Sequence, residues 1–182
     1  MKTVEAKVTL TPYGIPEGAS VVRSEKQYKD VRNLYENPRE DNPIVYEVYT
    51  YTEGEESKLG NLNWGLTVMH PVYSNGECNM TKGHFHSNRD CAEFYFCTQG
   101  EGLLLLMDEE GNTWAEVMKP GSLHHIDGHV AHRCVNTGDT DLYIGACWPS
   151  ASGHDYAAID EREFGFRVKK VDGELVFERR DS

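Results

Sequence analysis

Histidine is concentrated in one part of this 182-residue chain. Seven of its eight histidines lie between residues 84 and 154, and His84 and His86 stand two positions apart. Side chains alternate along a strand, so on a strand both imidazoles project to one face. Glu93 and His132 follow further along the chain. Three imidazoles and a carboxylate that converge would suit Fe(II), Mn(II), Zn(II) or Ni(II) and leave coordination positions open for a substrate.

These histidines could instead be surface groups or hydrogen-bonded core groups, and for an isolated His-x-His pair that alternative is favoured. Glu93 favours a metal site over these alternatives, because it lies within an apolar run, Ala92 to Thr98. A carboxylate in such a strand is costly unless it is paired or bound to a metal. We therefore favour the metal site, with His129 kept open as a further ligand.

The elements that must position these side chains have the pattern of short strands. Apolar runs separated by turn residues occupy 44–51, 65–72, 92–98, 102–107, 113–117, 123–126, 132–136 and 142–148. Such spacing favours an all-β sandwich or barrel. Asp172-Gly173, between strands expected at 164–170 and 174–179, predicts a type I′ hairpin that closes or covers one side of the barrel.

The N-terminal region has a different pattern. Residues 1–24 read as short extended pieces broken by proline and glycine. One helix is expected over residues 24–35, because Tyr28, Val31 and Leu34 recur at helical spacing.

Composition limits the function classes. The chain has 30 acidic and 18 basic side chains and a formal net charge of -12, which argues against nucleic-acid or anionic-membrane partners. The longest apolar run, Leu103 to Met107, is far too short to cross a bilayer, and the N-terminus lacks the apolar centre of a signal peptide. We expect a cytoplasmic protein. Its five cysteines include no CxxC pair and are expected to be reduced.

The order and spacing of the candidate ligands resemble the cupin family. His84-x-His86, Glu93 and Gly100 stand in the order of the first cupin motif, and Gly121, His132 and Asn136 in that of the second. The second motif departs from the general pattern at its proline and glycine positions, where this chain has Asp127 and His129.

Longer blocks resemble a narrower group, the cupin-type phosphoglucose isomerases. They are Thr-Lys-Gly-His-Phe-His at 81–86, Ala-Glu-Phe-Tyr at 92–95, Ala-His-Arg at 131–133 and Gly-His-Asp-Tyr at 153–156, with upstream blocks at 41–49 and 60–63. Where that family has a tyrosine before a proline, this chain has Trp148-Pro149. The resemblance implies a single cupin domain. Residues 1–40 would form an N-terminal extension containing the short helix, and residues 41–182 a double-stranded β-helix, or jelly-roll barrel, with a C-terminal hairpin.

The resemblance also implies an activity: the metal-dependent interconversion of glucose 6-phosphate and fructose 6-phosphate, which belongs to glycolysis and gluconeogenesis. One divalent ion per subunit, with Fe(II) ranked before Mn(II), Zn(II) and Ni(II), would be held by His84, His86, Glu93 and His132 and would polarise the substrate oxygens. Glu93 is the candidate base, because a base must reach its proton. A hydride shift that needs only the metal remains an alternative. The resemblance further suggests a homodimer.

Sugar-phosphate chemistry also needs groups that hold the phosphate. Thr81, Lys82 and Gly83 form a polar run directly before the first ligands, and Gly83 lets the backbone approach closely. Lys82 ranks below Thr81, because on a regular strand it would alternate away from His84. The resemblance adds Tyr46 and Thr67 near the phosphate. It places His154 and Tyr156 at the sugar end, with His154 assisting ring opening. Tyr95 shares the face of Glu93 and either bonds substrate or fills the lumen.

Two other functions use the same ligands. A cupin dioxygenase would hold Fe(II) to activate oxygen, would consume oxygen and would not need the threonine and lysine run. A non-catalytic sugar- or metal-binding cupin would bind its ligand without turnover. The presence of all four ligand types favours an enzyme.

Overall fold

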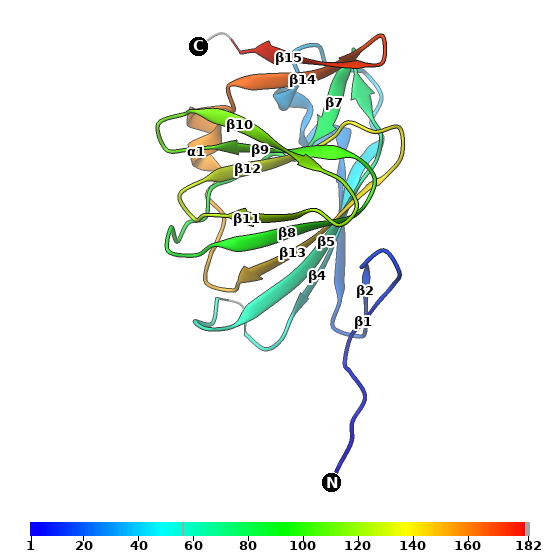
Figure 1. Cartoon of the computed structure of the whole chain (residues 1–182), viewed down its shortest axis with the longest axis vertical. Coiled ribbons are helices and arrows are strands. Elements are labelled where there is room, and N and C mark those ends of the chain that lie inside the picture. Colours follow the sequence, from blue (N-terminus) through cyan, green and yellow to red (C-terminus); the bar gives the residue numbers. More distant parts are fainter. Residues whose placement is uncertain (56, 181–182) are drawn as a thin grey trace.

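Two curled antiparallel sheets form most of the molecule in the computed structural model, which describes residues 1–55 and 57–180 (Figure 1). The predicted end of the barrel region at residue 182 therefore lies outside the described residues. The first sheet has six strands in the order β11-β8-β13-β5-β4-β3. Its strands are β3 (Val22–Gln27), β4 (Ile44–Thr52), β5 (Leu62–Met69), β8 (Glu93–Gln99), β11 (Leu123–Ile126) and β13 (Leu142–Pro149).

The second sheet has seven strands in the order β10-β9-β12-β7-β14-β15, with β6 paired to β7. Its strands are β6 (Tyr73–Ser74), β7 (Glu77–Met80), β9 (Gly102–Met107), β10 (Thr113–Met118), β12 (Ala131–Asn136), β14 (Phe166–Val171) and β15 (Glu174–Arg179). A separate hairpin of β1 (Thr9–Leu10) and β2 (Pro16–Glu17) precedes them.

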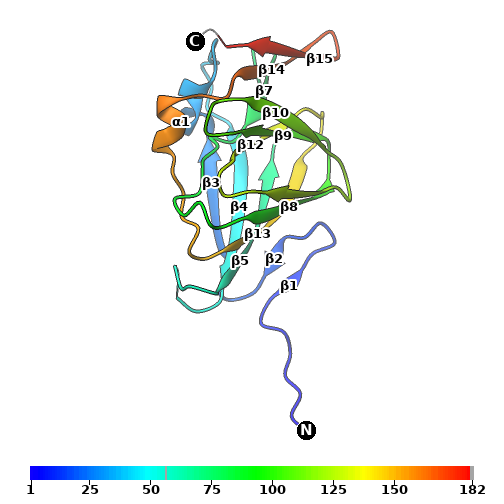
Figure 2. The same cartoon turned by 60° about the vertical axis from the view of Figure 1, so that its left-hand side comes forward.

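The core lies between the two sheets, which face each other (Figure 2). Met69 and Ile144 contribute to it from the first sheet, and Leu104 and Met107 from the second; all four are fully or almost fully buried. Because each sheet buries one face against the other, the strands close around this core as a jelly-roll barrel. The predicted all-β cupin fold is confirmed.

The strand bounds were predicted well because turn-forming residues separate the strands in the sequence. Strands β9, β11 and β15 have the predicted bounds, and the other predicted strands from Ile44 onward are displaced by up to three residues at an end. Asp172 and Gly173 both have positive φ, 51° and 85°, as a type I′ turn requires. The hairpin pairs through Lys169 of β14 with Glu77 of β7, so it extends the second sheet at its edge.

The predicted helix over residues 24–35 is wrong. Its first residues belong to β3, where Ser24 pairs with Val48 of β4. Two 3-10 turns follow, η1 (Tyr28–Asp30) and η2 (Arg32–Leu34). The apolar spacing of three residues that suggested a helix also buries one side of successive 3-10 turns. The α-helix of the described chain, α1 (Ala157–Glu161), lies after β13 and was not predicted.

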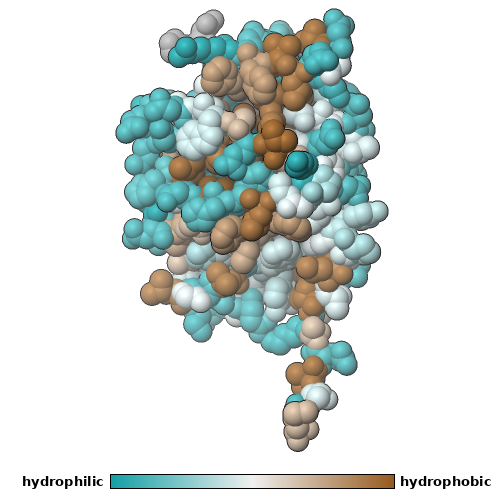
Figure 3. All heavy atoms as spheres, in the orientation of Figure 1, coloured by the Kyte–Doolittle hydropathy of each residue, from teal (hydrophilic) through white to brown (hydrophobic). Residues whose placement is uncertain are grey.

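The surface agrees with the composition. The face shown in Figure 3 is largely hydrophilic, with hydrophobic side chains interrupting it in small groups. None of the helices in the described residues is long and apolar enough to span a membrane. The five cysteines are free thiols, as predicted, and all except Cys147 are buried.

Candidate active site

Four side chains that are far apart in the sequence meet between the two sheets. The donor atoms of His84, His86, Glu93 and His132 all lie within 4.8 Å of one another. Glu93 begins β8 in the first sheet, and His132 lies on β12 in the second. Both backbone hydrogen bonds between His84 and His132 are formed, with N···O distances of 3.1 and 3.3 Å, so the segment after β7 is fixed against β12.

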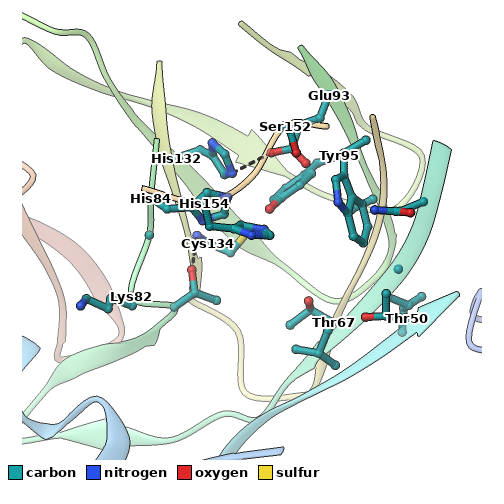
Figure 4. Close-up of a pocket in the computed structure, with 18 of the residues that line it drawn as sticks. Thr50, Thr67, Lys82, His84, Glu93, Tyr95, His132, Cys134, Ser152 and His154 are labelled. Atoms are coloured by element: carbon teal, nitrogen blue, oxygen red, sulfur yellow. Dashed lines mark hydrogen bonds and ion pairs between the residues drawn. The ribbon is translucent and has the colours of Figure 1, made fainter. Parts of the chain in front are cut away.

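Glu93 lies at the electrostatic centre of this cluster and is 4 % exposed. Its Oε1 is 2.7 Å from His132 Nε2 (Figure 4). The same oxygen is 3.2 Å from His86 Nε2. Burial alone would favour the neutral acid. The imidazoles of His132 and His86 outweigh that effect and hold the pKa of Glu93 below its usual range. The carboxylate is therefore ionised.

The cluster fits a divalent metal ion. Burial, assisted by His132 and His154, keeps the pKa of His84 well below its ordinary value, so its ring is neutral and offers a lone pair. His86 Nδ1 lies 2.6 Å from the carbonyl oxygen of Cys91, which can only accept, so the nitrogen donates there and the ring is oriented with Nε2 toward Glu93. Three imidazole nitrogens and one carboxylate oxygen form a donor set that suits Fe(II), Mn(II), Zn(II) or Ni(II).

The cluster forms part of the wall of a cavity of about 480 Å³. Every predicted site residue except His86 lines this cavity. Those outside the metal cluster are Tyr46, Thr67, Thr81, Lys82, Gly83, Tyr95, His154 and Tyr156. His86 is buried behind the wall and contacts Glu93. The structure thus brings the predicted residues together in one place, and their individual roles remain predictions.

The turn at Thr81, Lys82 and Gly83 is tightly constrained. Gly83 has φ +78°, and a Cβ there would lie 2.9 Å from the ring of Phe164, so this position requires glycine. Arg133 is fully buried and donates from Nε, at 3.1 Å, and from Nη2 to the carbonyl oxygen of Lys82. The same guanidinium bonds both carboxylate oxygens of Glu163, at 3.1 and 2.8 Å. These contacts hold the turn against the barrel.

The side chains of this turn have partners of their own. Thr81 Oγ1 accepts a hydrogen bond of 3.1 Å from the backbone N–H of Cys134 (Figure 4). Lys82 reaches the cavity wall because its segment is not a regular strand, and its Nζ lies 3.0 Å from Asp160 Oδ2. An aspartate of α1 therefore already neutralises part of the lysine charge.

A loop after β13 brings His154 and Tyr156 over the metal cluster. The Asp155 backbone pairs with that of Phe85, and Arg89 Nη2 donates to Asp155 Oδ2 at 3.1 Å. The His154 ring centroid lies 4.5 Å from that of His84 and is stacked on Tyr156 at 5.8 Å. Burial lowers the pKa of His154, so its ring is neutral. Burial also raises the pKa values of Tyr95 and Tyr156, so both hydroxyls remain protonated and able to donate.

Other residues that line the cavity were not placed there by sequence reasoning, among them Lys26, Asn63, Trp148 and Ser150. Trp148 was visible only as a departure from the family pattern. His129, which was kept open as a ligand, is more than half exposed, lies 3.4 Å from Glu109 and is not part of the cluster.

Comparison with known proteins identifies the family. A sequence model of the family described as Glucose-6-phosphate isomerase (GPI) matches residues 16–182. The chain belongs to the glucose-6-phosphate isomerase family. The glucose-6-phosphate isomerase of Pyrococcus abyssi is 37 % identical over 173 residues, 93 % of this chain and 90 % of that protein. That of Thermococcus litoralis is 41 % identical over 137 residues, 75 % of this chain and 71 % of that protein.

A relative from a further organism has the same name. The enzyme of Sinorhizobium medicae is 33 % identical over 156 residues, 81 % of this chain and 72 % of that protein. Among solved structures, an oxalate oxidase in complex with glycolate has a TM-score of 0.47 and 13 % identity, covering 85 % of this chain and 63 % of that one. Membership of the glucose-6-phosphate isomerase family makes the chain an enzyme of the isomerase class, as its sequence blocks predicted.

Proposed function

We propose that this isomerase interconverts glucose 6-phosphate and fructose 6-phosphate with one divalent metal ion held by His84, His86, Glu93 and His132. One observation carries the proposal: the four donor atoms lie within 4.8 Å of one another at the wall of the cavity that the other predicted site residues line. The names of the relatives support the sugar-phosphate substrate. The donor set suits Fe(II), Mn(II), Zn(II) and Ni(II). Among these, Fe(II) is the ion that we rank first, as in the sequence-based prediction.

The chemistry requires a net transfer of hydrogen between neighbouring carbons. A bound divalent ion would supply Lewis-acid polarisation of the carbonyl and hydroxyl oxygens of the open-chain sugar. Glu93 is the candidate base: its carboxylate takes the proton from C2 of the aldose and returns it to C1, while the hydroxyl proton of O2 moves to O1. His154, with a neutral ring beside His84, is proposed to assist ring opening, and Tyr95 to donate a hydrogen bond to the substrate. Direct hydride transfer from C2 to C1 is the alternative route.

The phosphate is proposed to lie at the turn of Thr81, Lys82 and Gly83. The hydroxyls of Tyr46 and Thr67 line the same cavity and add donors, while Tyr156 is proposed to contact the sugar end of the substrate. Lys82 is paired with Asp160, so its positive charge is partly neutralised. We therefore propose that the phosphate is bound mainly by hydrogen bonds from the threonine and tyrosine hydroxyls and from the glycine backbone.

The test is a coupled assay of fructose 6-phosphate conversion on chelator-treated protein, repeated after addition of Fe(II), Mn(II), Ni(II) or Zn(II). We expect negligible turnover without metal and recovery with at least one ion. Turnover that is unaffected by complete metal removal would contradict the metal-dependent mechanism. Bound metal without turnover would contradict the isomerisation itself, and oxygen uptake would then favour the dioxygenase.

Three further properties remain predictions: the homodimer, the cytoplasmic location with its place in glycolysis and gluconeogenesis, and the division of the chain near residue 40. Size-exclusion chromatography with light scattering would test the first.

A further inference from the structure

One wall of the cavity has no role in the proposed mechanism. It is built by Trp148 of β13 and by Gly65 of the neighbouring strand β5, which both line the cavity. Residues of β13 alternate between the two faces of the sheet, and Ala146 and Trp148 share the inner face. Ser150, just after the strand, also lines the cavity. Ala146 is the register partner of Gly65, so the indole lies next to the glycine, two residues along the strand.

Gly65 is needed for space. A Cβ at this position would lie 2.9 Å from both Cη2 and Cζ3 of Trp148, and 3.3 Å from the carbonyl oxygen of Tyr49. The six-membered part of the indole therefore occupies the place that a side chain at residue 65 would take. Any side chain at residue 65 would push the indole away from β5. Because Trp148 forms the cavity wall, that displacement would reduce the room inside.

The surroundings of the indole are polar but uncharged. Asn63 and Ser150 lie beside it and satisfy each other, because Ser150 Oγ donates to Asn63 Oδ1 at 2.7 Å. Thr50 also lines this part, and Figure 4 shows it on the opposite side of the histidines from Lys82. Within the described residues, the Trp148 indole N–H forms no hydrogen bond. The wall thus offers an apolar ring beside neutral polar side chains, a combination that suits the carbon chain of a sugar rather than its phosphate.

We propose that Trp148, seated against Gly65, is a specificity-determining residue that packs against the C–H groups of the sugar chain. The space over Gly65 fixes the depth of the indole and so the room for that chain. This inference rests on the proposed function for the class of substrate, a phosphorylated polyhydroxy chain.

The experiment measures the binding of two probes to the metal-loaded protein by isothermal titration calorimetry. Sorbitol 6-phosphate carries both the chain and the phosphate, whereas inorganic phosphate carries only the latter. Gly65→Ala should weaken sorbitol 6-phosphate binding about tenfold and leave inorganic phosphate binding unchanged, because a displaced ring removes room only for the chain.

The chain offers a matched control on the other face of the same strand pair. Gly145 of β13 lies beneath Trp64 of β5, and a Cβ there would be 3.1 Å from the indole carbon Cζ2. Neither residue lines the cavity. Gly145→Ala therefore crowds a tryptophan in the same way without changing the cavity, and it should leave the binding of both probes unchanged.

Two more variants keep the inference falsifiable. Trp148→Phe in the Gly65→Ala background should restore most of the sorbitol 6-phosphate affinity, because the smaller ring leaves room for the new methyl group. If Gly65→Ala does not fold, Trp148→Leu with the native glycine should show the same selective loss. Unchanged sorbitol 6-phosphate binding, or an equal loss of both probes, would overturn the inference. A wild-type protein that shows this selectivity but does not convert fructose 6-phosphate would overturn only the proposed function.

Discussion

Glu93 is the residue on which the proposed chemistry most depends. Its carboxylate is buried between two imidazoles that keep it ionised, and it lines the cavity. Glu93→Gln preserves its shape but removes the charge and the basicity. We expect turnover to fall by about two to four orders of magnitude, the usual contribution of a positioned base, while the far-UV circular dichroism spectrum stays native.

A matched control for this substitution exists elsewhere in the chain. Glu116 accepts a 2.6 Å hydrogen bond from Nδ1 of the buried His124, and neither residue lines the cavity. Glu116→Gln thus changes another histidine–carboxylate pair and should leave isomerisation unchanged. Full activity in Glu93→Gln would remove Glu93 from the mechanism.

The metal ligands could be predicted from the sequence because their chemistry requires residue types and spacings that are visible locally. His84 and His86 share a face through local alternation, and Glu93 is conspicuous as a carboxylate in an apolar run. Trp148 leaves no such signal. Its position in the wall depends on the register between β13 and β5 and on the missing side chain at Gly65. Both are features of the folded structure that the local sequence does not reveal.

Among the secondary-structure elements, the edge strand β3 was wrongly predicted to begin a helix. That error concealed Lys26 as a candidate site residue. As a helix, residues 24–35 would have had no fixed relation to the cavity. As a strand, β3 pairs with β4 and alternates. Arg23 contacts Glu25 and Glu47 on the outer face, whereas Lys26, opposite Tyr46, lines the cavity. Within the described residues, the ammonium group of Lys26 has no ion-pair partner.

This position makes Lys26 a candidate for attracting the substrate phosphate into an acidic protein. Lys26→Met should raise the KM for fructose 6-phosphate about three- to fivefold with little change in kcat, because an exposed charge at a binding site contributes modestly. Lys29→Met removes the same charge three residues away, outside the cavity lining, and should change neither constant. Steady-state kinetics at low ionic strength measures both. Equal KM values for Lys26→Met and the wild type would exclude the contact.

At the scale of the whole molecule, the architecture was predictable because many independent local signals agree. Turn residues separate apolar runs from Ile44 onward, and each run has a length that favours a strand. The short strands β6 and β7 escaped prediction because they lack clear alternation. All four residues of β7 are buried, including Glu77, whose carboxylate accepts a hydrogen bond from Arg167. Which strands pair within each sheet depends on packing between distant segments. The local patterns therefore left a sandwich and a barrel open, and the jelly-roll barrel was predicted only through the resemblance to cupins.

That closure predicts a link between metal and stability. The proposed ligands come from both halves of the barrel, Glu93 from the first sheet and His132 from the second, so a bound ion would join the sheets directly. An ion that binds only the folded protein stabilises it by about 2.7 kcal/mol at a hundredfold excess over its Kd. For a chain of this length we expect the melting temperature to rise by about 5 to 10 °C when metal is added to chelator-treated protein.

Differential scanning calorimetry with two histidine variants tests whether the cluster causes this rise. His132→Asn should abolish it. His124→Asn removes a histidine that is also buried and paired with a carboxylate, so it should lower the melting temperature yet keep the metal-induced increase. A metal-induced rise that persists in His132→Asn would mean that the ion binds elsewhere, and the two sheets would then be held together by their apolar core without it.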